Sequence, residues 1–179
     1  ICCGIMKAIS CFDPSIFDDD FNGQGLGSNP IGWSLSEGNG AVNIVSGLEG
    51  DRAVNVARLS SQNPTANHYF SPQDEKISFE FLARHNSGSG RVRIEVEGAT
   101  SGFGASFEDY IILKMYNGWI RNNNAQVMQY SLNTIYRIKV EVLPNANTFD
   151  LYVDEQLVGN DLPVYSTRNN VARISFTTE

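Results

Sequence analysis

The sequence predicts an all-β fold in which two antiparallel sheets pack face to face. Three observations support this prediction. Apolar and polar residues alternate with a period of two along most segments, as they do when one face of a strand is buried and the other meets water. Clusters of Gly, Asn and Pro separate these segments at short intervals. No segment keeps the period of 3.6 residues that is typical of an amphipathic helix.

Residues 1–15 are predicted to form an N-terminal arm with weak helical character, and residues 16–179 a single β-sandwich domain. The three cysteines, Cys2, Cys3 and Cys11, all lie in this arm. Cys11 can pair with either of the other two, which leaves one thiol for another chain or unpaired. A metal cage would need His or further Cys residues nearby.

Three adjacent aspartates, Asp18, Asp19 and Asp20, open the predicted domain. Calcium prefers several oxygen ligands, and alternate residues of a strand face the same way. Asp18 and Asp20 are therefore the predicted calcium ligands, completed by distant loops such as the one at residues 160–161. Solvated charge before a strand is the alternative interpretation.

Strands are expected through the rest of the chain, and Trp33, which follows a Gly- and Asn-rich loop, is expected in the core. The predicted strands are residues 41–45, 52–59, 66–70, 76–84, 91–97, 110–116, 119–121, 126–130, a hairpin over 135–158, and 171–177. The hairpin has the clearest alternation on both sides of its turn. Asn117-Gly118 is the strongest local turn signal, because both residues tolerate the positive φ of a type I′ turn.

Composition excludes some classes of partner. The formal net charge of −7 and the lack of clustered Lys and Arg in the sequence argue against nucleic-acid binding. No apolar run approaches the roughly 20 residues that span a bilayer, and the first residues lack the flanks of a signal peptide. We therefore expect neither nucleic acid nor a membrane span.

Several strand motifs together resemble a known family. The order FDDDFNG and P-x-G-W near the start, then Y-I-x-L and Y-x-I-x-V-x-V, then T-x-D-L-Y-V-D and a final I-x-F-x-T is similar to concanavalin A-like jelly-roll domains of the laminin-G, pentraxin and glucanase group. The resemblance covers residues 16–179 and is strongest to modules appended to secreted bacterial carbohydrate-active enzymes. It implies a secreted or extracellular jelly-roll that binds glycan or protein, often with a structural calcium; a minority of the family are hydrolases or lyases. The family usually has Asp-Gly in the turn where this chain has Asp154-Glu155.

Catalytic motifs are not recognised in the sequence. Jelly-roll glucanases resemble one another in a Glu-x-Asp-x-x-Glu strand, and glycoside hydrolysis needs paired carboxylates at a defined separation. The nearest pair here, Glu95 and Glu97, shares an outward face with Arg91 and Arg93, so solvated cross-strand ion pairing explains it. Neither histidine has the spacing of a catalytic triad or a metal site. We therefore lean towards a protein without catalysis.

A carbohydrate site is predicted around the turn at residues 117–118. Sugars dock their apolar ring faces on exposed aromatic rings, while amide and charged groups bond their hydroxyls. Trp119 and Tyr116 flank this turn, Arg121 and Asn123 lie next to it, and Tyr110 is expected to face outward on the same strand. The alternative is that Trp119 caps the edge of the core.

The resulting prediction is an extracellular, lectin-like module that binds a glycan or polysaccharide. The alternative is a structural or adhesive subunit of an extracellular assembly or virion, joined to other chains through the N-terminal arm or exposed sheet edges. A polysaccharide lyase or glycoside hydrolase is a third hypothesis.

Overall fold

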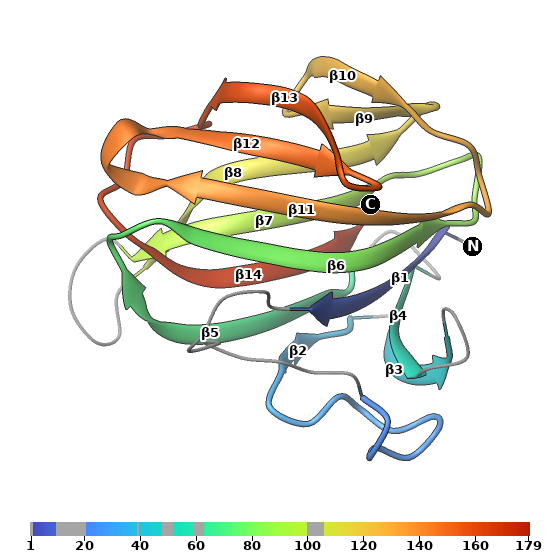
Figure 1. Ribbon diagram of the computed structural model, residues 1–179. Coiled ribbons are helices and arrows are strands. Elements are labelled where there is room, and N and C mark those ends of the chain that lie inside the picture. The colour runs from blue at the N-terminus through green and yellow to red at the C-terminus, as the bar shows by residue number, and fades with distance from the viewer. Residues whose placement is uncertain (1, 10–20, 39, 48–51, 59–62, 100–105) are drawn as a thin grey trace.

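The protein folds as a sandwich of two seven-stranded antiparallel sheets, here called sheet A and sheet B (Figure 1). The computed structural model describes residues 2–9, 21–38, 40–47, 52–58, 63–99 and 106–179, with the backbone alone for residues 2–9. Within these residues the only helical element is a 3-10 turn, η1 (Pro144–Ala146). The predicted antiparallel β-sandwich is confirmed.

Sheet A lies in front of sheet B in Figure 1. In the order of their hydrogen bonds, the strands of sheet A are β13 (Gln156–Pro163), β12 (Thr148–Val153), β11 (Ile135–Leu143), β6 (Ile77–His85), β1 (Cys2–Ile9), β4 (Arg52–Arg58) and β3 (Ala41–Ser46). Those of sheet B are β10 (Ala125–Gln129), β9 (Trp119–Asn122), β8 (Phe107–Tyr116), β7 (Val92–Ala99), β14 (Val171–Thr178), β5 (Thr65–Gln73) and β2 (Ser34–Ser36). Every predicted strand has a counterpart, whereas β1, β2 and β13 were not expected, and residues 159–161, which read as a turn, lie inside β13.

The first strand corrects the predicted N-terminal arm. β1 pairs antiparallel with β4 on one side and with β6 on the other, so Cys2–Ile9 is an inner strand of sheet A. Its sequence, CCGIMKAI, is almost entirely apolar and shows no alternation. A short apolar run of this kind does not distinguish a strand from a helix by periodicity, which is why the pattern was misleading.

The core between the sheets is built by the alternation that the sequence shows. In the hairpin of β11 and β12, Ile138, Val140 and Val142 and their partners Val153, Leu151 and Phe149 are all at most 1% exposed. Alternate residues of β7 and β14 on sheet B are buried against them. Burying such side chains contributes about 1.5 to 3 kcal/mol each, so this core is the main source of stability.

Two turns adopt the left-handed backbone that a tight hairpin needs. Asn117 and Gly118 have φ values of 52° and 76°, as predicted for a type I′ turn between β8 and β9. Asp154 and Glu155, between β12 and β13, have φ values of 48° and 67°. This second turn thus keeps the left-handed backbone of a tight hairpin although neither of its two central residues is glycine.

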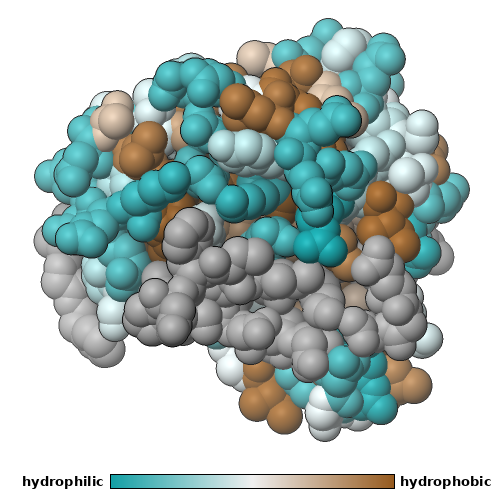
Figure 2. Space-filling view, viewed as in Figure 1, coloured by the Kyte–Doolittle hydropathy of each residue, from teal (hydrophilic) through white to brown (hydrophobic). Residues whose placement is uncertain are grey.

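Trp33 packs against the core, as predicted. Its ring lies 5.6 Å from that of Phe176 and 6.1 Å from that of Phe21. Figure 2 shows the molecule from the side of sheet A, where hydrophilic residues cover most of the described surface in view and hydrophobic residues form separate small groups. Among the described residues, no helix has the length and apolar character needed to cross a membrane.

Candidate functional site

The outer face of sheet B carries the side chains that alternate with its core residues. The strand register arranges them in rows across the sheet. One row joins Tyr116 to Trp119, and the next joins Arg93, Lys114 and Arg121. Two acidic residues, Glu95 and Glu97, lie further along β7 on the same face. Most residues predicted for the sugar site therefore lie on one face, together with groups that were not predicted.

An irregularity in β8 removes one predicted residue from this face. Val96 pairs with Ile111, but its neighbour Glu97 pairs with Asp109, so Tyr110 is the extra residue of a β-bulge. Tyr110 and Ile111 both turn into the core and are 0% exposed, and burial raises the pKa of the Tyr110 hydroxyl to about 12. The prediction that Tyr110 faces outward and binds sugar is therefore wrong.

Tyr116 and Trp119 form what we call the aromatic pair. They are direct partners across the β8–β9 hairpin, which places both rings on the outer face of sheet B. Tyr116 is 40% exposed and Trp119 is half-buried without belonging to the core. The guanidinium groups of Arg91 and Arg121 lie 5.4 and 5.9 Å from the centre of the Tyr116 ring. The alternative role of Trp119 as a cap on the core does not fit this position.

Arg121 and Asn123 lie beside the aromatic pair, as predicted. Arg121 Nη1 donates a hydrogen bond to the Asn124 carbonyl oxygen at 3.2 Å. Asn123 has a left-handed φ of 52° in the turn after β9, and its Oδ1 accepts a hydrogen bond from Lys114 Nζ at 3.2 Å. This turn thus positions an amide and two cations next to an exposed aromatic ring.

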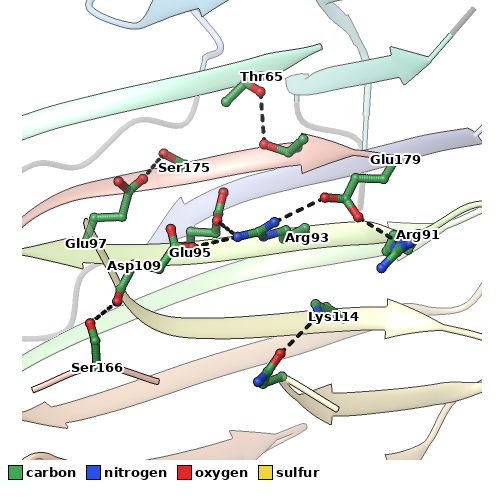
Figure 3. Close-up of polar contacts among 12 residues, drawn as sticks. Thr65, Arg91, Arg93, Glu95, Glu97, Asp109, Lys114, Ser166, Ser175 and Glu179 are labelled. Carbon is green, nitrogen blue, oxygen red and sulfur yellow. Dashed lines mark hydrogen bonds and ion pairs between the residues drawn. The ribbon is translucent and has the colours of Figure 1, made fainter. Parts of the chain in front are cut away.

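Glu95, Glu97 and Asp109 form a second feature, the carboxylate cluster, near the middle of the same face (Figure 3). Glu97 is 2% exposed and accepts a hydrogen bond from Arg173 Nε at 2.8 Å. Arg93 Nη2 lies 2.7 Å from Asp109 Oδ2 and also contacts Glu95. The expected ion pairing is confirmed, but the cluster is buried under its arginines rather than solvated.

The charges of the carboxylate cluster explain an unusual titration. The three carboxyl groups of the cluster share two arginines, Arg93 and Arg173, and Arg93 also pairs with Glu179. Burial, followed by the hydrogen bond and the negative charge of Asp109, raises the pKa of Glu95 to about 8, although Arg93 acts in the opposite direction. The raised pKa favours the protonated form of Glu95 at neutral pH.

Another aromatic site lies at the opposite end of β8 and was not predicted. The rings of Tyr69 on β5 and Phe107 on β8 lie 5.1 Å apart, and the Arg173 guanidinium lies 4.7 Å from the centre of Phe107. Tyr69 is 44% exposed. The bulge in β8 and the register of β5 with β14 bring these residues together, and neither leaves a signal in the local sequence.

Among the described residues, the carboxylate cluster is the group whose side chains lie close enough together to bind a metal ion. The oxygen atoms of the carboxylate cluster lie within 4.8 Å of one another, but Arg93 and Arg173 already occupy them. The predicted calcium ligands, Asp18 and Asp20, lie outside the described residues. In the loop expected to complete their site, Asp161 donates its backbone N–H to Asp150 Oδ1 at 2.8 Å.

The two histidines lie beside aromatic side chains. His85 is 1% exposed, and its Nδ1 lies 2.6 Å from the Tyr130 hydroxyl oxygen. Burial lowers its pKa, so it is neutral at pH 7. The His68 ring lies 5.1 Å from that of Trp33.

A pocket on the outer face of sheet A competes with the site on sheet B. It has a volume of about 210 Å³ and is lined by Leu82, Ile135, Arg137, Asp154 and Glu155. This volume is below the range of about 300 to 1,000 Å³ that is usual for ligand pockets. The outer face of sheet B is therefore the stronger candidate.

Comparisons with known proteins give a single kind of information, the fold. No family model matches the sequence, and no curated protein sequence matches it. Among solved structures, a sialidase chain superposes on 91% of this chain with a TM-score of 0.73 and 20% identity. The matched part is 15% of the sialidase chain, so this chain spans a small part of that protein's length. The β-sandwich is thus shared with a segment of a carbohydrate-active enzyme.

Proposed function

We propose that this chain is a concanavalin A-like carbohydrate-binding module that holds a glycan on the outer face of sheet B. The observation that carries this proposal is the aromatic pair, in which Tyr116 and Trp119 lie side by side and partly exposed on an open sheet face. Exposed rings of this kind stabilise the apolar faces of sugar rings by stacking.

Polar groups around the aromatic pair suit the hydroxyl groups of a sugar. Lys114, Arg121 and Asn123 present donors and an acceptor at the rim of the rings. Gln129 and Gln126, the register partners of Trp119 and Arg121 on β10, add exposed amides. The likeness to part of a sialidase supports the same class of ligand, since such an enzyme acts on carbohydrate.

An extracellular location is part of this proposal, because soluble and surface glycans are the expected ligands. A structural calcium at Asp18 and Asp20 also stays a prediction and is tested by removing calcium during the binding measurement.

Glycoside hydrolysis has one observation in its favour. Glu95, whose pKa is raised, lies beside a second carboxyl group, Asp109, and glycoside hydrolysis uses a pair of carboxyl groups. The side chain of Glu95 is only 12% exposed, and Arg93 contacts both groups. We therefore expect binding without release of reducing ends.

The experiment is a glycan and polysaccharide binding screen on the purified chain, run with calcium and with chelator. Trp119→Ala is expected to abolish binding because it removes half of the aromatic pair. Tyr152→Ala is the matched control, since Tyr152 is a half-buried aromatic residue on the other sheet, stacked with Lys139 at 5.3 Å. Both variants are first checked for folding by thermal denaturation.

Three results would overturn the proposal. Equal loss of binding in the folded Trp119→Ala and Tyr152→Ala variants would show that the aromatic pair is not the binding site. Silence of the folded natural chain across the screen would favour the assembly subunit, and release of reducing ends that is lost in Glu95→Gln would favour the hydrolase.

A further inference from the structure

Four cations gather at the end of sheet B that carries the aromatic pair. Arg93, Lys114 and Arg121 are successive partners across β7, β8 and β9, so their side chains start about 5 Å apart on one face. Arg91 lies beside them with its guanidinium against the Tyr116 ring. The chain has only 13 basic residues and a net charge of −7, so this grouping runs against its overall composition.

The acidic residues nearby neutralise only part of this group. Arg91 Nε and Arg93 Nη1 lie 2.8 and 3.2 Å from the two carboxylate oxygens of Glu179 (Figure 3). Lys114 and Arg121, by contrast, form no ion pair with a carboxylate among the residues that the structure describes, and their hydrogen bonds go to neutral oxygen atoms.

Fold stability does not explain the arrangement. Like charges directly opposite each other on neighbouring strands are destabilising, and Lys114 has one on each side. Burial and the positive charges of Arg93 and Arg91 lower the pKa of the Lys114 ammonium group. Lys114 and Arg121 are therefore neighbouring cations without a carboxylate partner among the residues that the structure describes.

We propose that the ligand of the aromatic pair is an acidic glycan whose carboxylate or sulfate group binds between Lys114 and Arg121. This inference rests on the proposed function and adds the chemical class of the sugar. The geometry suits a single acidic sugar, because the Arg121 guanidinium lies 5.9 Å from the Tyr116 ring centre. An acidic substituent of a ring stacked on the aromatic pair would thus meet Arg121, and Lys114 is the register partner of Arg121 on the neighbouring strand.

The test measures the affinity of the full chain for polysaccharides that differ only in charge. Polygalacturonate is compared with its methyl ester, and dextran sulfate with dextran, so that the two arms separate carboxylate from sulfate. We expect at least one acidic member to bind about tenfold more tightly than its neutral partner, and salt to weaken that binding.

Variants then locate the anion. Arg121→Gln and Lys114→Gln are expected to remove about tenfold of the affinity for the acidic polysaccharide. They should remove a smaller share of any affinity for the neutral one, since glutamine keeps an amide donor for a sugar hydroxyl group. Lys139→Gln is the matched control, because Lys139 lies on the outer face of sheet A, paired with Glu141 at 2.5 Å. It should leave both affinities unchanged.

The outcomes separate this inference from the proposed function. Equal binding of neutral and acidic members that is lost in Trp119→Ala would keep the sugar site and overturn the acidic ligand. Acidic binding that Lys139→Gln weakens as much as Arg121→Gln does, or that duplex DNA equals, would show unspecific charge attraction and also overturn it. No binding to any member overturns both.

Discussion

The side chains of Glu95 and Asp109, on neighbouring strands, bring carboxyl oxygen atoms within 4.8 Å of each other. Because the pKa of Glu95 in the folded protein, about 8, lies above its ordinary value of 4.5, the folded state holds a proton that the unfolded state has lost between these values. The stability from this group is complete below pH 4.5 and declines as the pH rises towards 8.

Glu95→Gln is expected to remove this decline. Glutamine imitates the protonated side chain and can still donate to Asp109. Relative to the natural chain, the variant should gain on the order of 2 kcal/mol in free energy of unfolding at pH 9 and little at pH 5. Urea denaturation at the two values checks this, and a difference that is the same at both would contradict the protonated Glu95.

Glu141 on sheet A should show the opposite dependence on pH. Hydrogen bonds from Lys139 and Lys76 lower its pKa, so the stability it gives is present above pH 4.5 and lost as the pH falls through the lowered value. Glu141→Gln is expected to cost about 1 kcal/mol at pH 7 and almost nothing at pH 3. The same denaturation series measures it, and an equal cost at both values would rule out the ion pairs as its cause.

Arg173 holds the most buried carboxylate of the cluster. Arg173→Met leaves Glu97, which is 2% exposed, without its cation and is expected to lower the free energy of unfolding by about 3 kcal/mol. Adding Glu97→Leu to that variant should restore much of the loss, since it removes the buried charge. Arg91→Met is the control, because the Arg91 side chain is 42% exposed and should contribute less than about 1 kcal/mol. If Arg173→Met costs no more than this control, the buried pair is not stabilising.

Replacement of Glu155 in the β12–β13 turn by glycine is expected to stabilise the protein. Glu155 has a φ of 67°, a conformation that costs a side chain about 1 kcal/mol. Glu155→Gly is therefore expected to raise the free energy of unfolding by about 1 kcal/mol in thermal or urea denaturation.

Asp154→Gly is the matched control for this turn and should destabilise the chain. Asp154 also has a positive φ, but its Oδ1 accepts the backbone N–H of Arg137 at 2.9 Å. Stabilisation by both substitutions would show that this hydrogen bond contributes nothing.

The sequence predicted those features of the fold that are determined by a few consecutive residues. The alternation of Ile138, Val140 and Val142 set the inner face of β11, and Asn117-Gly118 set the hairpin that presents the aromatic pair. Both depend on properties that a few consecutive residues carry: the direction of side chains on a strand and tolerance of positive φ.

The remaining features depend on partners far away in the chain. Tyr110 turned inward because of a bulge between β8 and β7, and no local signal marks the extra residue. The carboxylate cluster is buried because Arg173, more than 70 residues later, covers Glu97. Sequence reasoning found the charges of Glu95 and Glu97 and their arginine neighbours but had no means of finding that burial.

The last strand of the chain, β14, is an inner strand of sheet B. β14 lies between β7 and β5, so Arg173 pairs with both Glu97 and Tyr69. Contacts between residues so distant in sequence make folding slow, because a long loop must close before they form. During synthesis, β7 and β5 therefore expose unpaired edges until β14 emerges, and such edges readily pair with other chains. At high expression levels, nascent chains should therefore aggregate more readily than the folded protein, in which β14 pairs with both edges.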